Sequence, residues 1–436
     1  MRAPYPSYER PCGWQALLPA APPRPRLAGS ERADLVVVGA GFTGLAAART
    51  WAEQRPADRV LVLDAAAVGD GSPGRNSGFM LEITLADDAD PAAVSRLARC
   101  NELIGDTMTW LRELVQDHGI DCQLARSGTY RGAATTVGER NLARYRAFLE
   151  AAGLPFESLD RDALAARIGT RFYRAGLYSP DCSLVQPAAL IRGLAAALPA
   201  SVEILEHSPV VELSPPGRPA GGWRVRGQQG VVETPRVILA NNGFARGLGV
   251  GASRLAVIYT YAGLTGPLEP GELESLGSDP GWGLLPAHRL GTTLRRTADG
   301  RLLARSLYGY ERESDNAHVA VQLAASLRRR FPQLDRLAGP QPFAEVWGGT
   351  TGLTYNGAPL WGEPRPGLYV SAGCNGGGVV KGSLFGRLLA RRALGEAVPD
   401  VGALFGAASW MPPEPLRRLG FVLQSSWERL SARAEA

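Results

Sequence analysis

Lysine is almost absent from this chain of 436 residues, because Lys381 is the only lysine and the other 46 of the 47 basic residues are arginines. Such a bias is typical of GC-rich coding, so a single arginine is first expected to be a solvated surface residue. The 42 acidic residues leave a formal net charge of only +5, and the arginines are spread along the chain. This distribution argues against a nucleic-acid-binding surface. Lys381, in contrast, is retained within a glycine-rich loop.

Cysteine and histidine are also scarce, and long apolar runs are missing. The five cysteines form an odd set without a CxxC pair or a metal-ligand spacing, and the four histidines are scattered. These patterns predict reduced thiols in a reducing compartment and no metal site. No apolar run reaches 18 residues, and residues 1–27 lack the apolar core of a signal peptide. We therefore expect a cytoplasmic protein without a membrane span.

The most informative stretch is 34–44, which reads DLVVVGAGFTG. A short apolar strand that ends in GxGxxG and opens a helix brings backbone N–H groups against a pyrophosphate. A second apolar run ends in an acid at 64, where a carboxylate binds a ribose hydroxyl. Strand, turn, helix, strand and acid in this order predict a dinucleotide-binding unit. Its expected cofactor-binding residues are Gly39, Gly41, Phe42, Thr43, Gly44 and Asp64.

Three more glycine clusters lie far apart in the sequence, at 74–78, 241–243 and 373–382. A flavin ring is flat and is approached by backbone along an edge and a face, so these clusters favour FAD over NAD. In these four motifs the chain resembles the FAD-dependent amine and amino-acid oxidoreductases of the D-amino acid oxidase superfamily, which includes glycine oxidase, sarcosine oxidase and gamma-glutamylputrescine oxidase. The resemblance extends from about residue 30 to about residue 395.

The resemblance implies an α/β fold, in which a Rossmann-like three-layer FAD-binding domain is interleaved with an α+β substrate domain built on an antiparallel sheet. The implied division is an N-terminal arm at 1–29, an FAD-binding domain at 30–88, 183–252 and 341–411, a substrate domain at 89–182 and 253–340, and a helical tail at 412–436. We expect the arm to be extended, because it is rich in proline. The amphipathic tail is expected to pack its apolar residues on the body of the protein rather than on lipid.

The resemblance also implies further cofactor contacts. Gly377 stands where the family has the histidine of a Gly-His-Gly element, so no role of that histidine is expected here. Cys374, in the same loop, raises the alternative of a covalently attached flavin. The remaining expected FAD-binding residues are Arg75, Asn76, Ser77, Gly78, Val210, Asn241, Gly243, Gly373, Asn375, Gly376, Gly377, Gly378, Val379 and Lys381.

The implied reaction is hydride transfer from a carbon bearing a neutral amine to flavin N5, followed by hydrolysis of the imine. The expected partners are a small amine or amino acid and an electron acceptor, either O2 or another compound. The lysine that sarcosine-type members keep on their substrate-domain hairpin is missing, so the acceptor stays open. Two alternatives also stay open: a flavin dehydrogenase that passes electrons to a quinone at the membrane surface, and a non-catalytic FAD-binding protein.

The substrate-domain hairpin around 299–300 offers a candidate anion site. Read as a two-residue Asp-Gly turn, it pairs Arg296 with Leu303 and places Arg296 and Arg305 on one face. By resemblance, the face of Arg305 looks onto the flavin, and two arginines there suit a bidentate clamp on a carboxylate. Aromatic candidates for the pocket are Tyr259, Tyr261, Trp282, Tyr308 and Trp347.

Overall fold

The computed structural model describes residues 4–81, 94–215, 222–432 and 435. At its centre lies a six-stranded sheet in the order β19-β20-β13-β2-β3-β9. All neighbours are parallel except β19, which runs antiparallel to β20. The strands are β2 (Leu35–Val38), β3 (Val60–Leu63), β9 (Val202–Leu205), β13 (Val237–Leu239), β19 (Leu360–Arg365) and β20 (Leu368–Ala372).

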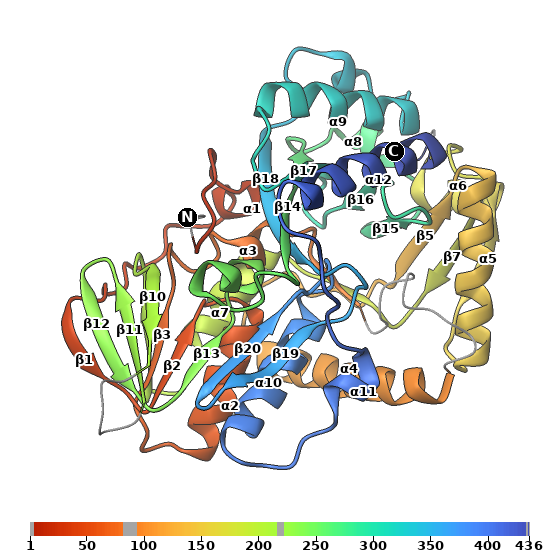
Figure 1. Ribbon diagram of the computed structural model, residues 1–436. Coiled ribbons are helices and arrows are strands. Elements are labelled where there is room, and N and C mark those ends of the chain that lie inside the picture. Colours follow the sequence, from red (N-terminus) through yellow and green to blue (C-terminus); the bar gives the residue numbers. More distant parts are fainter. Residues whose placement is uncertain (1–3, 82–93, 216–221, 433–434, 436) are drawn as a thin grey trace.

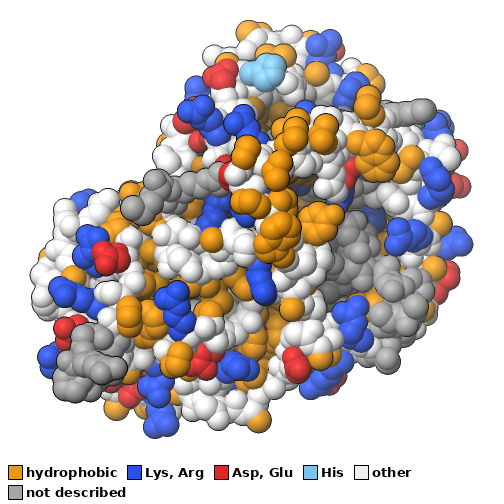
Figure 2. Space-filling model, in the orientation of Figure 1, with side chains coloured by type: hydrophobic (Ala, Val, Ile, Leu, Met, Phe, Trp, Pro, Cys, Tyr) orange, Lys and Arg blue, Asp and Glu red, His pale blue; other side chains and the backbone are white. Residues whose placement is uncertain are grey.

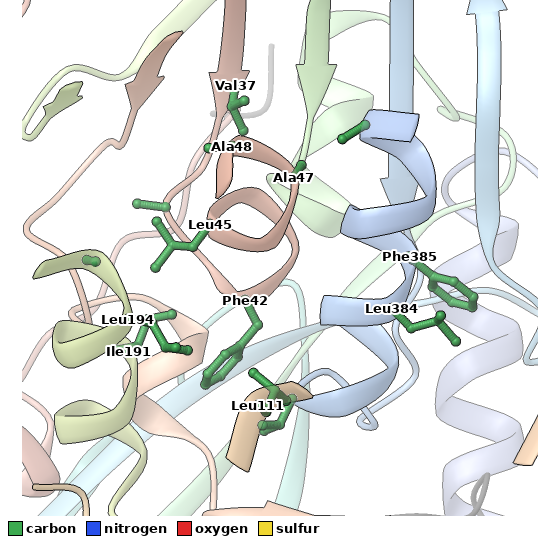
Figure 3. Close-up of a cluster of buried hydrophobic side chains, with 14 of the residues drawn as sticks. Val37, Phe42, Leu45, Ala47, Ala48, Leu111, Ile191, Leu194, Leu384 and Phe385 are labelled. Carbon is green, nitrogen blue, oxygen red and sulfur yellow. The ribbon is translucent and has the colours of Figure 1, made fainter. Parts of the chain in front are cut away.

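Three layers form around this sheet because its strands are apolar on both faces. Leu35 and Val37 of β2 pack on a helical layer, whereas Val36 and Val38 pack on a second, four-stranded sheet. Figure 3 shows Val37 together with Phe42, Leu45 and the surrounding helices. The helices are α2 (Phe42–Gln54), α4 (Val94–Asp117), α7 (Pro187–Ala196) and α10 (Val380–Ala393), and the small sheet contains β1 (Gly29–Arg32), β10 (Val210–Ser214), β11 (Trp223–Gly227) and β12 (Gly230–Thr234).

A separate eight-stranded sheet has the order β18-β14-β17-β16-β15-β5-β7-β6 and is antiparallel except between β15 and β5. Its strands are β5 (Thr129–Ala133), β6 (Glu157–Asp160), β7 (Ala175–Ser179), β14 (Ala256–Leu264), β15 (Trp282–Pro286), β16 (Thr293–Arg296), β17 (Leu302–Tyr310) and β18 (Glu345–Leu353). The expected fold class is confirmed by these two architectures. The domain division remains a proposal, and its boundary at 88 and 89 lies outside the described residues. The boundary at 341 needs correction, because β18 pairs with β14 in this sheet.

The other elements connect and cover the two sheets (Figure 1). No helix in the described part of the chain combines the length and the apolar character that crossing a bilayer requires. The remaining elements are α1 (Gly13–Ala16), α3 (Ser72–Arg75), β4 (Phe79–Met80), α5 (Thr136–Ala151), α6 (Arg161–Ile168), β8 (Ser183–Leu184), η3 (Asn242–Leu248), α8 (Pro270–Glu274), α9 (Asn316–Arg330), η4 (Asp335–Ala338), α11 (Val401–Phe405) and α12 (Leu416–Ala432).

The N-terminal arm differs from the expected extended segment. It forms the short helix α1 and buries Cys12 and Trp14. The Trp14 indole donates a hydrogen bond to the Asn76 carbonyl (2.8 Å) and meets the Trp347 ring edge-on. The prolines of the arm precede or follow α1, so they do not prevent this turn from packing into the core.

The hairpin between β16 and β17 shows that the predicted register was wrong by one residue. Thr293 pairs with Arg305 and Arg295 with Leu303. The turn contains three residues, 298–300, because Gly300 takes a left-handed conformation (φ +73°) typical of a three-residue hairpin loop. Arg296 therefore lies on the opposite face from Arg305 and donates hydrogen bonds to the carbonyls of Gly277 and Asp279. The two-arginine clamp is not formed.

Candidate functional site

A cavity of about 1040 Å³ lies between the six-stranded sheet and the eight-stranded sheet. At one end it meets the carboxyl ends of β2, β3 and β13, where Gly39, Asp64 and Ala240 line it. At the other end it reaches β17 and the C-terminal helix α12. Ligands of open α/β sheets bind at the carboxyl ends of the strands, and this volume lies at the upper end of the range for small-molecule sites. The cavity therefore has room for a large cofactor together with a small substrate.

The glycine turn after β2 is tight because backbone fills the space that side chains would need. Gly39 has φ +104°, and its N–H donates to the Leu63 carbonyl (2.8 Å). A Cβ at Gly44 would lie 1.9 Å from the Gly39 carbonyl oxygen. Gly41 lines the cavity at the start of α2. The turn thus has the geometry predicted for a pyrophosphate cradle, with close helix packing at Gly44 and an approachable backbone at Gly41.

Asp64 closes β3 and lines the cavity. Its carboxylate accepts hydrogen bonds from the N–H groups of Ala40 (2.7 Å) and Ala66 (3.0 Å). Burial raises the pKa of this carboxyl, and the two N–H donors act in the opposite direction. Two N–H groups do not exhaust the acceptor sites of a carboxylate, so Asp64 retains the capacity to bind a ribose hydroxyl.

Substitution of Asp64 by alanine should weaken FAD binding by about 1 to 3 kcal/mol, since a charge-assisted hydrogen bond and the support of the Ala40 N–H are lost. Asp64→Asn keeps one carbonyl acceptor and should lose less. Fluorescence titration of the apoprotein with FAD gives both dissociation constants. A control is Glu203→Ala on the neighbouring strand, which removes only an exposed ion pair with Arg59. An unchanged dissociation constant for the alanine variant would show that Asp64 does not bind the ribose.

The loop at 72–78 is organised mainly by its own hydrogen bonds. The buried Arg75 guanidinium donates to the carbonyls of Asp70, Gly348 and Arg10. The Asn76 amide donates to the Pro73 carbonyl (2.6 Å) and accepts from the Gly78 N–H. The segment contains one helical turn, α3, with proline near its start. We interpret Arg75 as a residue that positions this loop against the cavity.

The loops after the neighbouring strands β13 and β20 lie side by side at the cavity wall. The Asn242 side chain joins them, accepting from the Gly373 N–H (2.8 Å) and donating to Cys374 Sγ (3.1 Å). Asn241 lines the cavity, and its buried Oδ1 has no hydrogen-bond partner within the described residues. A Cβ added at Gly376 would meet no described atom within 4 Å. An unpaired buried acceptor and an open glycine backbone fit a polar, flat ligand such as flavin.

Most of the expected cofactor residues lie around this one cavity. Gly44, Gly78 and Gly373 do not line it, and they act by allowing close packing behind it. The expected residues that line the cavity are Gly39, Gly41, Phe42, Thr43, Asp64, Arg75, Asn76, Ser77, Val210, Asn241, Gly243, Asn375, Gly376, Gly377, Gly378, Val379 and Lys381. Their contact with FAD stays a prediction.

The expected substrate residues divide into two groups. Arg305, Tyr308 and Tyr261 line the cavity. Tyr259 instead donates to the Ser7 carbonyl, and Trp347 is fully buried and donates to the Arg75 carbonyl. Neither of these two side chains lines the cavity, so they act as packing residues. Trp282 and Arg296 likewise pack outside the cavity.

Arg305 is a basic group at the substrate end of the cavity that can bind an anion. Its Nη1 donates to the Tyr308 hydroxyl (3.1 Å), which in turn donates to the Arg289 carbonyl (2.9 Å). Within the described residues Arg305 forms no ion pair. Because a guanidinium carries five N–H groups, most of its donors are still available to a ligand.

The sequence prediction missed the contribution of α12 to the cavity wall. Gln424 and Glu428 line the cavity, and Glu428 forms an ion pair with Arg289. Glu435 anchors the end of the chain by accepting from the N–H groups of Ala134 and Thr135. The polar residues of this amphipathic helix repeat with helical spacing on the face opposite its apolar residues. That pattern could have indicated that the polar face lines a site.

Comparisons with known proteins agree with this geometry. The family model "FAD dependent oxidoreductase" matches residues 34–392. The chain is 28% identical over 396 residues to a probable oxidoreductase, OrdL, of Rhizobium meliloti (strain 1021), covering 88% of each chain. It is 26% identical over 384 residues to the gamma-glutamylputrescine oxidoreductase of Escherichia coli (strain K12), covering 84% of each.

Among solved structures, the fold is similar to that of glycine oxidase from Geobacillus kaustophilus, with a TM-score of 0.72 and 20% identity over 87% of this chain and 99% of that one. The expected superfamily and the expected cofactor, FAD, are thereby confirmed. With its dinucleotide turn, its flavin-sized cavity and a family model that matches 359 consecutive residues of the sequence, the chain belongs to the DAO family of FAD-dependent oxidoreductases.

Proposed function

We propose that the protein oxidises the C–N bond of a small amine or amino acid that carries an anionic group. The observation that carries this proposal is the continuity of one cavity from the dinucleotide turn to Arg305, a guanidinium without an ion pair in the described part of the chain. FAD, when bound, supplies the hydride acceptor, and the imine formed from the amine is then hydrolysed by water. The protein needs to contribute orientation and a dry pocket.

The residues at the substrate end support such a role. The hydrogen bonds from Arg305 to Tyr308 and from Tyr308 to the Arg289 carbonyl hold the guanidinium at the cavity wall. A carboxylate bound there is fixed in two directions, since a guanidinium binds it bidentately. Phe79, Ile258 and Leu285 add apolar surface to the cavity wall, which favours exclusion of water when ligands are bound. A substrate bound in this way has its reacting carbon held in a fixed position.

The names of relatives favour the same substrate class. One relative acts on gamma-glutamylputrescine and one structural neighbour is a glycine oxidase, by their names. The acceptor has two alternatives, O2 and another electron carrier. No lysine stands on the β16–β17 hairpin, where sarcosine-type members keep one, so this feature favours neither acceptor.

Turnover of the holoenzyme with a panel of amino acids and amines tests the proposal. For a substrate in air, an oxidase should release one carbonyl product, one ammonia or primary amine, and one H2O2 for each O2 consumed. A dehydrogenase should give the same organic products only when an artificial electron acceptor is added. Absence of carbonyl product from every amine under both conditions would contradict C–N oxidation.

A further inference from the structure

The C-terminal helix α12 has two different faces. Its inner face is attached to the body: Arg417 donates to the carbonyls of Leu255 (2.9 Å) and Ala252 (3.0 Å), and Glu428 pairs with Arg289. Arg417, Phe421 and Glu428 also line the cavity. Because both ends of the inner face are held, the opposite face of the helix is fixed toward the outside.

That outer face is apolar and exposed, which corrects the expectation that the apolar residues of the tail pack on the body. Trp427 is 69% and Leu430 is 76% exposed. Five exposed apolar side chains follow one another at intervals of three, four, four and three residues, from Leu416 through Leu419, Leu423 and Trp427 to Leu430. This spacing places them in one stripe along the helix. Figure 2 shows a continuous hydrophobic patch where Figure 1 places α12. The exposed apolar residues of the helix are Leu416, Leu419, Val422, Leu423, Trp427 and Leu430.

The charges on α12 are arranged for an anionic partner. Arg418 and Arg429 are its exposed charged side chains, whereas its acidic residue, Glu428, is buried against Arg289. A second exposed tryptophan, Trp410, precedes the helix in the sequence. Leucine and tryptophan on one face with arginine beside them are typical of helices that lie in the interface of an anionic bilayer.

A second copy of the chain fits this face less well as an antiparallel pair. Two α12 helices related by a two-fold axis perpendicular to them run antiparallel, with the same flank of each on the same side. This arrangement brings Arg418 of one copy near Arg429 of the other. The one carboxylate within the helix, Glu428, is buried, and the exposed Glu414 just before the helix accepts from the Arg418 N–H of its own chain. Like charges across a helix pair destabilise it. An anionic lipid surface has the opposite effect on the same two arginines.

We propose that the outer face of α12 docks on the surface of an anionic lipid bilayer. The apolar stripe enters the interfacial region, and the arginines bind lipid headgroups. Because the inner face of the same helix forms part of the cavity wall, docking places that wall of the cavity next to the membrane. The inference concerns an interaction surface and does not depend on which amine is the substrate.

Flotation of the full-length holoenzyme with vesicles tests the proposal. Vesicles of phosphatidylcholine with about one third phosphatidylglycerol should carry the protein, and pure phosphatidylcholine vesicles should carry much less. Binding should fall in about 0.5 M NaCl, since salt screens the arginine contribution. The double variant L423S/W427S should reduce the fraction bound at a fixed lipid concentration by about tenfold.

The matched control is Val321→Ser, which removes an exposed apolar side chain (69% exposed) from α9 and should leave flotation unchanged. FAD content and melting temperature should be the same in all variants, because the changed side chains are exposed. In sedimentation velocity without lipid, the parent protein and L423S/W427S should have the same oligomeric state. Equal flotation of parent and double variant, no flotation with anionic vesicles, or a dimer that the double variant dissociates would each overturn lipid docking.

Discussion

Replacement of Gly44 by alanine should yield a protein without bound FAD. The new Cβ would lie 1.9 Å from the Gly39 carbonyl oxygen and 3.2 Å from Val37 Cγ1. Since the first of these atoms is backbone, no side-chain rotation relieves the clash, and α2 must move away from the turn that follows β2. Overpacking typically costs about 1 to 3 kcal/mol, and a clash with backbone lies at the upper end of this range, which corresponds to roughly 100-fold in the FAD dissociation constant. The ratio of flavin absorbance to protein concentration after gel filtration measures the fraction of protein that retains FAD.

Gly105→Ala supplies the matched control for this prediction. It makes the same chemical change within α4, at a site where a Cβ would meet no described atom within 4 Å. We expect normal FAD content and an unfolding free energy raised by about 0.5 to 1 kcal/mol, because alanine favours a helix interior over glycine. If Gly44→Ala retained FAD as well as Gly105→Ala does, the close packing of turn and helix would not be needed for binding.

Replacement of Arg305 by leucine should slow flavin reduction by anionic amines. The loss of a charge-assisted hydrogen-bonding partner costs about 1.5 to 3 kcal/mol, so kcat/KM should fall about 10- to 100-fold. The effect should be mainly on substrate binding and should be small for amines without an anionic group. Arg305→Lys keeps the charge but loses the bidentate geometry, so it should recover only part of the rate.

The variant Arg296→Leu distinguishes the observed pairing of β16 and β17 from the pairing predicted from the sequence. Arg296 lies on the opposite face of the sheet and donates to the Gly277 and Asp279 carbonyls, so its loss should not change the ratio of rates with anionic and neutral amines. A ratio that falls in Arg296→Leu as it does in Arg305→Leu would contradict the register. If Arg305→Leu reduced anionic and neutral amines at parental rates, Arg305 would not be the anion site, and Tyr261 and Tyr308 would be tested next.

The dinucleotide unit could be predicted from the sequence because its requirements are local. The four-residue strand β2, the glycine turn and the start of α2 are consecutive, and Asp64 follows at the end of the next parallel strand. Parallel strands bring their carboxyl ends to one edge of a sheet, so these residues meet without knowledge of the rest of the fold.

Features that depend on distant parts of the chain could not be predicted in this way. A single left-handed residue, Gly300, shifted the hairpin register and moved Arg296 to the other face. Trp14 of the arm packs edge-on against Trp347, which lies more than 300 residues away in the sequence. The periodicity of α12 correctly indicated an amphipathic helix, but its polar face contacts the cavity and its apolar face points outward. Periodicity gives two faces and does not say which one is covered.

Anaerobic mixing of the purified holoenzyme with amines tests directly whether the protein oxidises the C–N bond of an anionic amine. The experiment follows loss of the oxidised flavin absorbance after mixing with a panel of amino acids and other anionic amines, each paired with the analogue in which a hydroxyl replaces the amine. If the protein oxidises an anionic amine, at least one such amine bleaches the flavin, its hydroxyl analogue does not, and Arg305→Leu slows the reaction. A flavin that stays oxidised with every amine, or that is reduced equally by the hydroxyl analogues, would contradict oxidation of an anionic amine.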